Sequence, residues 1–324
     1  MTWLMMFMFS LLAVGHAVFF VKRTFARRKL FFGTDTLNTP PREVDPSLVL
    51  RLDGKRGISA KEITSTLLFF VLNGYASLTQ KNDDVCFHAK TAPDYLPGQY
   101  IYHFLFFEVG DDGILHVDDV YRYTESDQGR AEFLDALSQW EGKLEEELED
   151  LHWLKLFPAF KKQMIASQIV MLLLSSVLLF VVAWFGVLAI VLTILSFILL
   201  LKEPGLTHEG EQELSRWHMY RRYLQDIRSD DHHRPENVGA HFVYAAGFGL
   251  IASLKEAFPI REASELSLRT DQFPLYFYAA PGTFALSMES FDLLRDTEEA
   301  FNQGLNPGLI PGDVASDSTG LTFE

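Results

Sequence analysis

Residues 164–201 read MIASQIVMLLLSSVLLFVVAWFGVLAIVLTILSFILLL and contain no Lys, Arg, Asp or Glu. A straight helix of these 38 residues would measure about 57 Å, nearly twice the roughly 30 Å hydrocarbon core of a bilayer. One span therefore does not account for the run. Two spans that reverse near Ala183-Trp184-Phe185-Gly186 fit the length, because Trp suits the membrane interface and Gly permits a tight reversal. We predict a transmembrane hairpin over 164–201.

A second charge-free run, residues 1–21, opens the sequence and is long enough to cross a bilayer. A cleavable signal peptide has basic residues before its apolar core, whereas here they follow it, so we predict an uncleaved anchor, with cleavage after Ala17 as the alternative. His16 is an ionisable residue inside this span. A proton-relay role is one interpretation, and the favoured one is a side chain that reaches the membrane interface.

Basic residues flank the predicted spans and define their orientation. Lys161 and Lys162 precede the hairpin, Lys202 follows it, and a basic cluster follows residue 21. Because cytoplasmic flanks carry the excess of Lys and Arg, we predict a multi-pass protein of the bacterial inner membrane, with its N-terminus outside and its soluble parts cytoplasmic. The predicted contacts with an anionic inner leaflet of the lipid bilayer are Lys22, Arg23, Arg27, Arg28, Lys29, Lys161, Lys162 and Lys202.

The predicted fold class is an integral membrane protein, mainly α with minor β, in which three transmembrane helices accompany a cytoplasmic winged-helix-like α+β region. Residues 22–163 and 202–324 carry −5 and −10 of the net charge of −15, which argues against a freely diffusing nucleic-acid binder. Cys86 is the single cysteine, so no disulfide scaffold is possible. The expected division is a transmembrane anchor (1–21), a basic juxtamembrane linker (22–41), a cytoplasmic winged-helix-like and helical region (42–163), the transmembrane hairpin (164–201), a C-terminal cytoplasmic helical region (202–301) and a disordered tail (302–324).

The winged-helix-like prediction rests on residues 42–92. Ser59-Ala60-Lys61-Glu62 matches a capping box that starts a helix, Gly74 ends this helix, and residues 75–79 and 85–89 have strand patterns. DNA recognition is the functional interpretation of helices followed by a two-stranded wing. We expect no nucleic acid, because seven basic residues are balanced by six acidic ones and the helix presents Lys61 as its one cation.

Three further segments are predicted to be helical. Residues 128–157 have an apolar stripe and an acidic face, and residues 239–254 are too short and glycine-rich for a span, so we expect a buried helix there. Residues 211–228 carry an apolar face that packs either on the inner leaflet or on the first cytoplasmic region; both alternatives stay open. The apolar stripe of residues 128–157 consists of Phe133, Leu137, Trp140, Leu144, Leu148 and Leu151.

Several polar groups in the sequence are candidates for metal or catalytic sites. Glu149 and His152 supply one E-x-x-H pair, but a di-iron bundle needs two. We find no Walker loop, H-E-x-x-H or C-x-x-C, and Cys86 with His88 is not interpreted as a nucleophile and its base. No cofactor or metal is expected. The remaining candidates lack either further metal ligands nearby or the spacing of an EF-hand. They are the acidic residues Asp111, Asp112, Asp118 and Asp119 and the run Asp230-Asp231-His232-His233.

Four stretches occur in order around the hairpin: PPREVDPSLVLRLDG (40–54), ISAKEITSTLLFFVLNGYASLTQ (58–80), RWHMYRRYLQDI (216–227) and VYAAGFGLIASLKEAFP (243–259). Over most of residues 40–295 the chain thus resembles the C-terminal half of the bacterial predicted-membrane-protein family called domain of unknown function 2207, the YciQ-like proteins. Trp217, Tyr220, Arg221, Tyr223 and Leu224 match the family's W-x-x-[FY]-[RK]-x-[YF]-L helix. Tyr244, Ala245 and Gly249 match part of its L-P-Y-A-x-A-L-G stretch, in which Phe242-Val243 replaces Leu-Pro.

The resemblance implies the membrane topology and supplies no catalytic residue. Family members typically carry a signal peptide and an extracytoplasmic β-rich domain before the first anchor, whereas this sequence begins with the anchor. We predict a non-enzymatic inner-membrane scaffold or protein-interaction module with an unidentified protein partner. The alternatives are a membrane-bound enzyme or small-solute handling protein that uses His16 or the Glu149 and His152 pair, and a membrane-tethered DNA-binding regulator.

Overall fold

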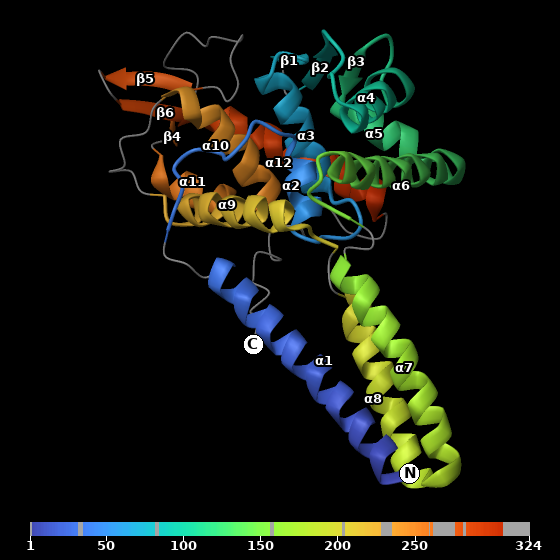
Figure 1. Ribbon diagram of the computed structural model, residues 1–324. Coiled ribbons are helices and arrows are strands. Elements are labelled where there is room, and N and C mark those ends of the chain that lie inside the picture. Colours follow the sequence, from blue (N-terminus) through green and yellow to red (C-terminus); the bar gives the residue numbers. More distant parts are fainter. Residues whose placement is uncertain are drawn as a thin grey trace. The chain divides into compact units, whose positions relative to one another are not determined.

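The computed structural model describes residues 2–31, 35–81, 84–155, 159–202, 205–227, 235–258, 260–261, 276–280 and 283–306 (Figure 1). The chain forms two compact units. We call residues 1–35 and 151–215 the span unit, and residues 36–150 and 216–324 the head unit. Each unit is therefore assembled from segments that lie far apart in the sequence.

The span unit consists mainly of α1 (Thr2–Phe31), α7 (Ala159–Val181) and α8 (Ala183–Lys202). Three segments in these helices are long and apolar enough to cross a membrane: Trp3–Lys22, Lys161–Val181 and Ala183–Leu200. The expected number of spans is confirmed. The first of these segments ends at Lys22, one residue beyond the predicted anchor over 1–21, and α1 itself continues to Phe31 through residues that we expected to form a linker.

The hairpin reverses at Val182, between α7 and α8. Gly186 is needed there for close packing, since a Cβ atom at this position would lie 2.2 Å from Leu179 Cα. Near the reversal, Phe185 meets Phe9 of α1 edge to face, with 6.2 Å between ring centroids. The N-terminal half of α1 thus lies beside the tip of the hairpin.

Two extended segments join at the base of the hairpin. Leu154 forms a bridge with Leu206, and the Lys155 amide donates to Gly205 O at 2.8 Å. This pairing draws the chain out of the preceding helix, so α6 (Asp127–Asp150) ends at Asp150 and not at the predicted Phe157. His152 follows with φ 60°, a left-handed conformation that stops a helix.

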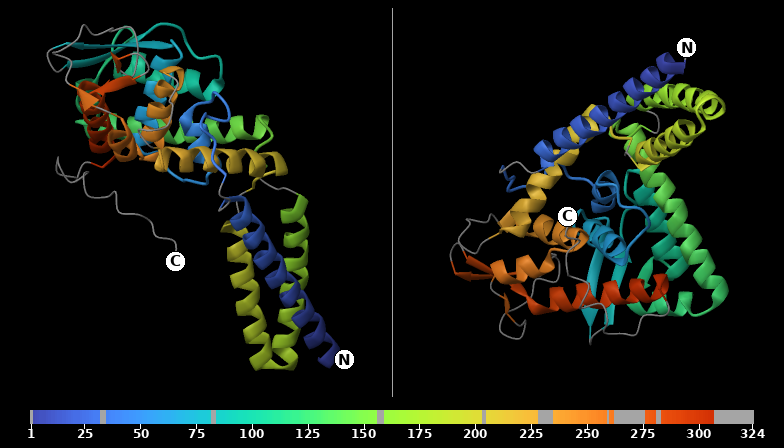
Figure 2. Two further views of the ribbon diagram at one scale, coloured as in Figure 1. Left: turned by 90° about the vertical axis from the view of Figure 1, so that its left-hand side faces the viewer. Right: turned by 90° about the horizontal axis from the view of Figure 1, so that it is seen from below.

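The head unit is built around α3 (Ala60–Leu72), which α2 (Pro46–Leu52), α10 (Pro235–Phe248) and α12 (Met288–Leu305) contact (Figure 2). Ten of its 13 residues are buried. The predicted helix start and stop are confirmed: Ser59 Oγ accepts a hydrogen bond from the Glu62 amide at 3.3 Å, and Gly74 follows the helix with φ 75°.

A three-stranded antiparallel sheet follows α3, in the order β1 (Ala76–Lys81), β2 (Asp84–Ala89) and β3 (Ile114–His116). The first two strands confirm the strand predictions. Between β2 and β3 the chain forms α4 (Leu96–His103) and a π-helical turn, η1 (Phe104–Val109). It then continues through α5 (Val117–Thr124) into α6, whose predicted stripe is buried from Phe133 to Leu148.

The rest of the head unit is helical with a second small sheet. α9 (His208–Gln225), which belongs to this unit from Arg216 onward, precedes α10 and α11 (Ile251–Ala257), and Gly249, with φ 71°, separates the latter two. The sequence did not predict β4 (Ile260–Arg261), β5 (Tyr276–Ala280) and β6 (Thr283–Ser287), which form a sheet in the order β4-β6-β5, nor α12. Because α12 extends to Leu305, the expected tail does not begin at 302; residues 307–324 lie outside the described residues.

Candidate functional site

The residues that match the family motif of α9 meet those of α10 in an aromatic cluster. Trp217, Tyr220 and Tyr244 are each at most 2% exposed. The Trp217 and Tyr244 ring centroids are 4.9 Å apart, and Tyr220 meets Tyr244 edge to face at 5.8 Å. The apolar face of this part of α9 therefore packs inside the head unit, which supports the packing alternative over the leaflet one.

Hydroxyl groups of this cluster bind polar groups that the sequence did not single out. Tyr220 Oη lies 2.8 Å from Nδ1 of the buried His241. Tyr244 Oη donates to Val44 O at 2.6 Å and accepts from the Val44 amide at 3.3 Å, which ties α10 to the segment that precedes α2. Buried tyrosines normally find such partners, and these bonds fix the segment in place.

The other motif positions support the same packing. Arg221 Nη1 lies 3.4 Å from Asp53 Oδ2, and its guanidinium is 5.6 Å from the centroid of the Phe248 ring. Leu224 and Ala245 are fully buried, Tyr223 stacks on Tyr220, and Gly249 ends α10. The structure thus brings the predicted motif residues together: Trp217, Tyr220, Leu224, Tyr244 and Ala245 are buried in a core, and Arg221, Tyr223 and Gly249 lie at its edge.

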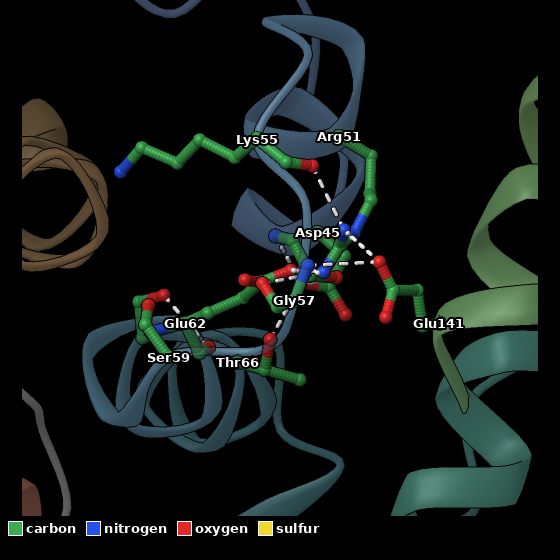
Figure 3. Close-up of polar contacts among 10 residues, drawn as sticks. Asp45, Arg51, Lys55, Gly57, Ser59, Glu62, Thr66 and Glu141 are labelled. Atoms are coloured by element: carbon green, nitrogen blue, oxygen red, sulfur yellow. Dashed lines mark hydrogen bonds and ion pairs between the residues drawn. The ribbon is translucent and has the colours of Figure 1, made fainter. Parts of the chain in front are cut away.

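A network of buried polar residues lies next to this core, between α2, α3 and α6 (Figure 3). Asp45 is 1% exposed and caps α2, because its carboxylate accepts from the Ser47 amide at 2.9 Å. The same carboxylate accepts from Thr66 Oγ1 at 2.8 Å and from the Tyr95 hydroxyl. One carboxylate therefore joins three segments of the head unit.

Arg51 occupies the centre of the network, and its side chain is 2% exposed. Its guanidinium donates to Glu141 Oε1 at 2.5 Å and to Glu62 Oε1 at 3.4 Å. It also donates to the carbonyl oxygens of Lys55 at 2.8 Å and Gly57 at 3.0 Å (Figure 3). A buried cation is tolerated when it is paired and hydrogen-bonded in this way.

Burial shifts the proton affinity of two carboxyl groups, those of Glu62 on α3 and of Asp45, which caps α2. It raises the pKa of Glu62 to about 7, and the Arg51 guanidinium opposes this only in part. Burial also raises the pKa of Asp45, against hydrogen bonds from Tyr95, Ser47 and Thr66. In the described part of the chain Glu62 Oε2 has no hydrogen-bond partner, which further favours the neutral form. The network holds the fold together and includes a group that titrates near neutral pH.

A second polar cluster lies within the span unit and contains His16. Its Nε2 is 2.7 Å from Ser167 Oγ of α7, and its Nδ1 is 3.0 Å from Ser196 Oγ of α8. Gln168 Nε2 lies 3.0 Å from the same Nδ1 and donates to Ser196 Oγ at 2.6 Å. The sequence favoured a His16 side chain that reaches the membrane interface. In the structure this side chain is instead 6% exposed and bonded to both other spans.

This cluster predicts that His16→Leu loosens the three-helix bundle. Hydrogen bonds between membrane helices contribute about 0.6 kcal/mol each, up to about 1.7. We expect the loss of the His16 contacts to lower the free energy of unfolding of the reconstituted chain by about 1–3 kcal/mol in steric-trapping or denaturant measurements. Ser10→Ala is the matched control, since Ser10 bonds only to Met6 O of its own helix among the contacts that the structure describes. Equal stability of the two variants would contradict the prediction.

The cysteine has a histidine neighbour other than the one close in sequence. Cys86 Sγ lies 3.0 Å from Nδ1 of His116, its register partner on β3. His88 instead lies with Nε2 2.8 Å from Thr79 Oγ1 on β1. Sequence reasoning could not find the Cys86 and His116 pair, because it depends on a third strand that joins the sheet from 25 residues beyond the end of β2.

Among the residues that the structure describes, the sequence candidates for a metal site do not gather ligands. In the described ranges no group of three or more His, Cys, Asp or Glu side chains is placed to hold a metal ion. The E-x-x-H pair is interrupted, since Glu149 belongs to α6 and His152 lies beyond its end. Asp230-Asp231-His232-His233 lies outside the described residues.

The predicted leaflet contacts of the hairpin lie near helix ends, whereas Lys22 and Arg23 lie within α1, which continues to Phe31. Lys22 is exposed on α1, Lys162 is exposed and Lys161 half-buried at the start of α7, and Lys202 ends α8. The side chains of Arg23, Arg27, Arg28, Lys29 and Lys202 lie outside the described part of the structure.

Comparison with known protein families gives a match to most of the chain. The family described as "Predicted membrane protein (DUF2207) C-terminal domain" matches residues 35–258. No curated protein and no solved structure matches the chain. The matched range contains α2, α3, the hairpin, α9 and α10 and stops before β4, so it is shorter at its C-terminal end than the resemblance over 40–295. Because the match covers more than half of the 324 residues, the chain belongs to the DUF2207 C-terminal-domain family of predicted membrane proteins.

Proposed function

We propose that the chain is a bacterial inner-membrane protein whose head unit is a cytoplasmic, non-enzymatic module that binds a protein partner. The observation that carries this proposal is the position of the family-motif residues. Trp217, Tyr220, Leu224, Tyr244 and Ala245 build the core of the head unit, so the motif supports a fold and not a reaction centre. A stable fold that presents a surface is what a binding module needs.

The arrangement of α2, α3, β1 and β2 supports a winged-helix-like description, and the burial of α3 argues against DNA binding. A DNA reader inserts an exposed helix into the major groove and contacts several phosphates. In α3, Lys61 is the single fully exposed position, and α10 and α12 contact the helix. We therefore propose that the winged-helix-like region contributes to protein contacts.

The orientation is supported by the charges at the ends of the spans. Lys22 lies in the half of α1 that is remote from the hairpin tip, because Phe9 packs at that tip. Lys161 and Lys162 begin α7 at the base of the hairpin. The positive-inside rule then favours a cytoplasmic side for this end and for the residues that follow it.

Reporter fusions after residues 35, 185 and 230 test this topology. We expect an inside, an outside and an inside signal, respectively, because the basic flanks hold both ends of the hairpin in the cytoplasm. Compartment-specific reporters, such as a periplasmic phosphatase and a cytoplasmic fluorescent protein, give opposite readouts. An outside signal after residue 35 would refute the orientation.

The binding role is tested by crosslinking in native membranes, followed by identification and quantification of the proteins that remain with the chain. A defined partner at stoichiometric amounts is the expected result. Stoichiometric metal in the purified chain, or loss of a cellular phenotype on His16→Ala with the complex intact, would instead support the enzyme or solute-handling alternative.

A further inference from the structure

Residues 53–59, which we call the α2–α3 segment, are attached to α6 through a guanidinium and a carboxylate (Figure 3). Arg51 Nη1 donates to Lys55 O at 2.8 Å, and Nη2 donates to Gly57 O at 3.0 Å. Glu141 Oε1 on α6 accepts from the Gly57 amide at 3.0 Å and from Arg51 Nη1 at 2.5 Å. The position of the α2–α3 segment therefore depends on the pairing of Arg51 with Glu141.

Glu62 places a second carboxyl group beside the same guanidinium, in surroundings that suit its neutral form. Its side chain is 1% exposed, and Oε1 lies 3.4 Å from Arg51 Nη2, near the limit of a hydrogen bond. Oε2 has no hydrogen-bond partner in the described part of the chain. The buried Asp45 carboxylate, by contrast, accepts four hydrogen bonds. A buried carboxylate with so few donors is poorly stabilised, so the observed arrangement fits a protonated Glu62.

The charges around Glu62 do not compensate for its burial. Burial raises the pKa of this residue to about 7, and the cations Arg51 and Lys55 oppose the shift only in part. The Asp45 carboxyl adds to the shift, because a second negative charge nearby disfavours ionisation. One guanidinium thus serves both Glu62 and Glu141.

Other helices packed against α3 bring further titratable groups into this region. α10 contributes His241, which is bonded to Tyr220. α12 contributes Glu298, which lies near Lys61 and whose pKa is raised by burial to about 7. Glu298 therefore titrates in the same range as Glu62, and an experiment must separate the two carboxyl groups.

We propose that proton loss from Glu62 releases the α2–α3 segment from α6. The new anion draws the guanidinium of Arg51 toward it, because opposite charges attract each other more strongly in the interior than near solvent. The side chain of Glu141 is 27% exposed, against 1% for Glu62. The bonds from Arg51 Nη1 to Glu141 and to Lys55 O then lengthen. This proton-controlled switch goes beyond the proposed binding function and does not depend on it.

Hydrogen exchange of the Gly57 amide tests the switch, because this amide is bonded to Glu141 in the attached arrangement. The full chain is placed in nanodiscs of zwitterionic lipid, and single-amide exchange rates at pH 6 and pH 8 are divided by the intrinsic rates. We expect the protection of Gly57 to fall about tenfold between these pH values. This is the linkage of one proton whose pKa drops from about 7 to the ordinary 4.5 on release.

The amide of Leu67, a fully buried residue of α3, is the internal reference for unfolding of the whole unit. A local release requires Gly57 to exchange at least about tenfold faster than Leu67 at pH 8. Equal rates for the two amides would assign the pH effect to global unfolding and would overturn the switch.

Glu62→Gln keeps the shape of the side chain and has no proton to lose, so the protection of Gly57 should be equal at pH 6 and pH 8. Glu298→Gln and Glu145→Gln are the matched controls. The first removes the other carboxyl group that titrates near pH 7, and the second removes an exposed carboxylate one turn from Glu141. Both should retain the tenfold change. Its persistence in Glu62→Gln, or its loss in Glu298→Gln, contradicts the assignment to Glu62.

Glu141→Gln tests the same switch with Glu62 left in place. An amide oxygen accepts from a guanidinium more weakly than a carboxylate does, so Arg51 should leave this position more readily. We expect the protection of Gly57 at pH 6 to fall at least about threefold relative to the native chain. Unchanged protection would show that the pairing of Arg51 with Glu141 does not hold the α2–α3 segment, which removes the basis of the switch.

Discussion

Arg51→Met is expected to lower the free energy of unfolding of the head unit by about 3–5 kcal/mol, the cost of breaking a buried ion pair on one side. Arg51 donates to Glu62, to Glu141 and to two carbonyl oxygens, so its removal leaves several acceptors without their donor. Methionine fills a similar volume, which limits the effect of lost packing. Denaturant unfolding of the full chain, followed by the fluorescence of the buried Trp140 and Trp217, measures the change.

Two further variants make this prediction specific. Arg56→Met is the matched control, because Arg56 is exposed a few residues further on, in the segment between α2 and α3, and the stability of this variant should change by at most about 0.5 kcal/mol. Arg51→Met/Glu62→Leu should recover part of the loss, since it removes the polar carboxyl group that Arg51→Met leaves buried next to an apolar side chain. If Arg51→Met and Arg56→Met unfold alike, the network does not stabilise the head unit.

The stability of the head unit is expected to fall as the pH rises from about 5 to 8, because Glu62 loses its proton in the buried state. Its folded-state pKa is about 7 against an ordinary value of 4.5, so the folded chain binds an additional proton between these two values. The slope for one such proton is about 1.4 kcal/mol per pH unit within that window, and it vanishes above the folded-state pKa. The contribution is fully present below 4.5 and is lost as the pH passes 7.

Glu62→Gln isolates this effect from all other titrating groups. The variant keeps the shape of the side chain and cannot ionise, so its stability profile should lack one proton of linkage between pH 5 and 8. Thermal or denaturant unfolding at a series of pH values gives the difference between the two profiles. Parallel profiles for the native chain and Glu62→Gln would show that the residue does not change protonation on unfolding.

The sequence predicted those parts of the fold that depend on local physics. A charge-free run of 38 residues is too long for one span and therefore predicted the hairpin. The Ser59 capping box and Gly74 predicted the two ends of α3. The aromatic spacing in α9 predicted an apolar face because its period matches a helix, and the structure buries Trp217, Tyr220 and Leu224 of this face in the head unit. Each of these features is decided within a few turns of chain.

Features that depend on contacts between distant segments were missed. α6 ends at Asp150 and not at the predicted Phe157, because Leu154 pairs with Leu206 at the base of the hairpin. His16 is hydrogen-bonded to Ser167 and Ser196, which lie more than 150 residues away in the sequence. Cys86 contacts His116 on β3. The buried polar network was not predicted for the same reason. Its members come from separate parts of the sequence and show no common spacing: Asp45, Arg51, Glu62 and Glu141.

The split construction of the head unit has a consequence for biosynthesis. α3 leaves the ribosome early, but α10 and α12, which contact it, are translated only after the whole hairpin. At about 5–20 residues per second, the interval between Leu72 and Pro235 lasts on the order of ten to thirty seconds. During this time the apolar faces of α3 lack their final cover while α7 and α8 enter the bilayer. Nascent chains of this protein should therefore bind chaperones until the second half of the head unit emerges, and truncation after the hairpin should leave an aggregation-prone membrane-bound fragment.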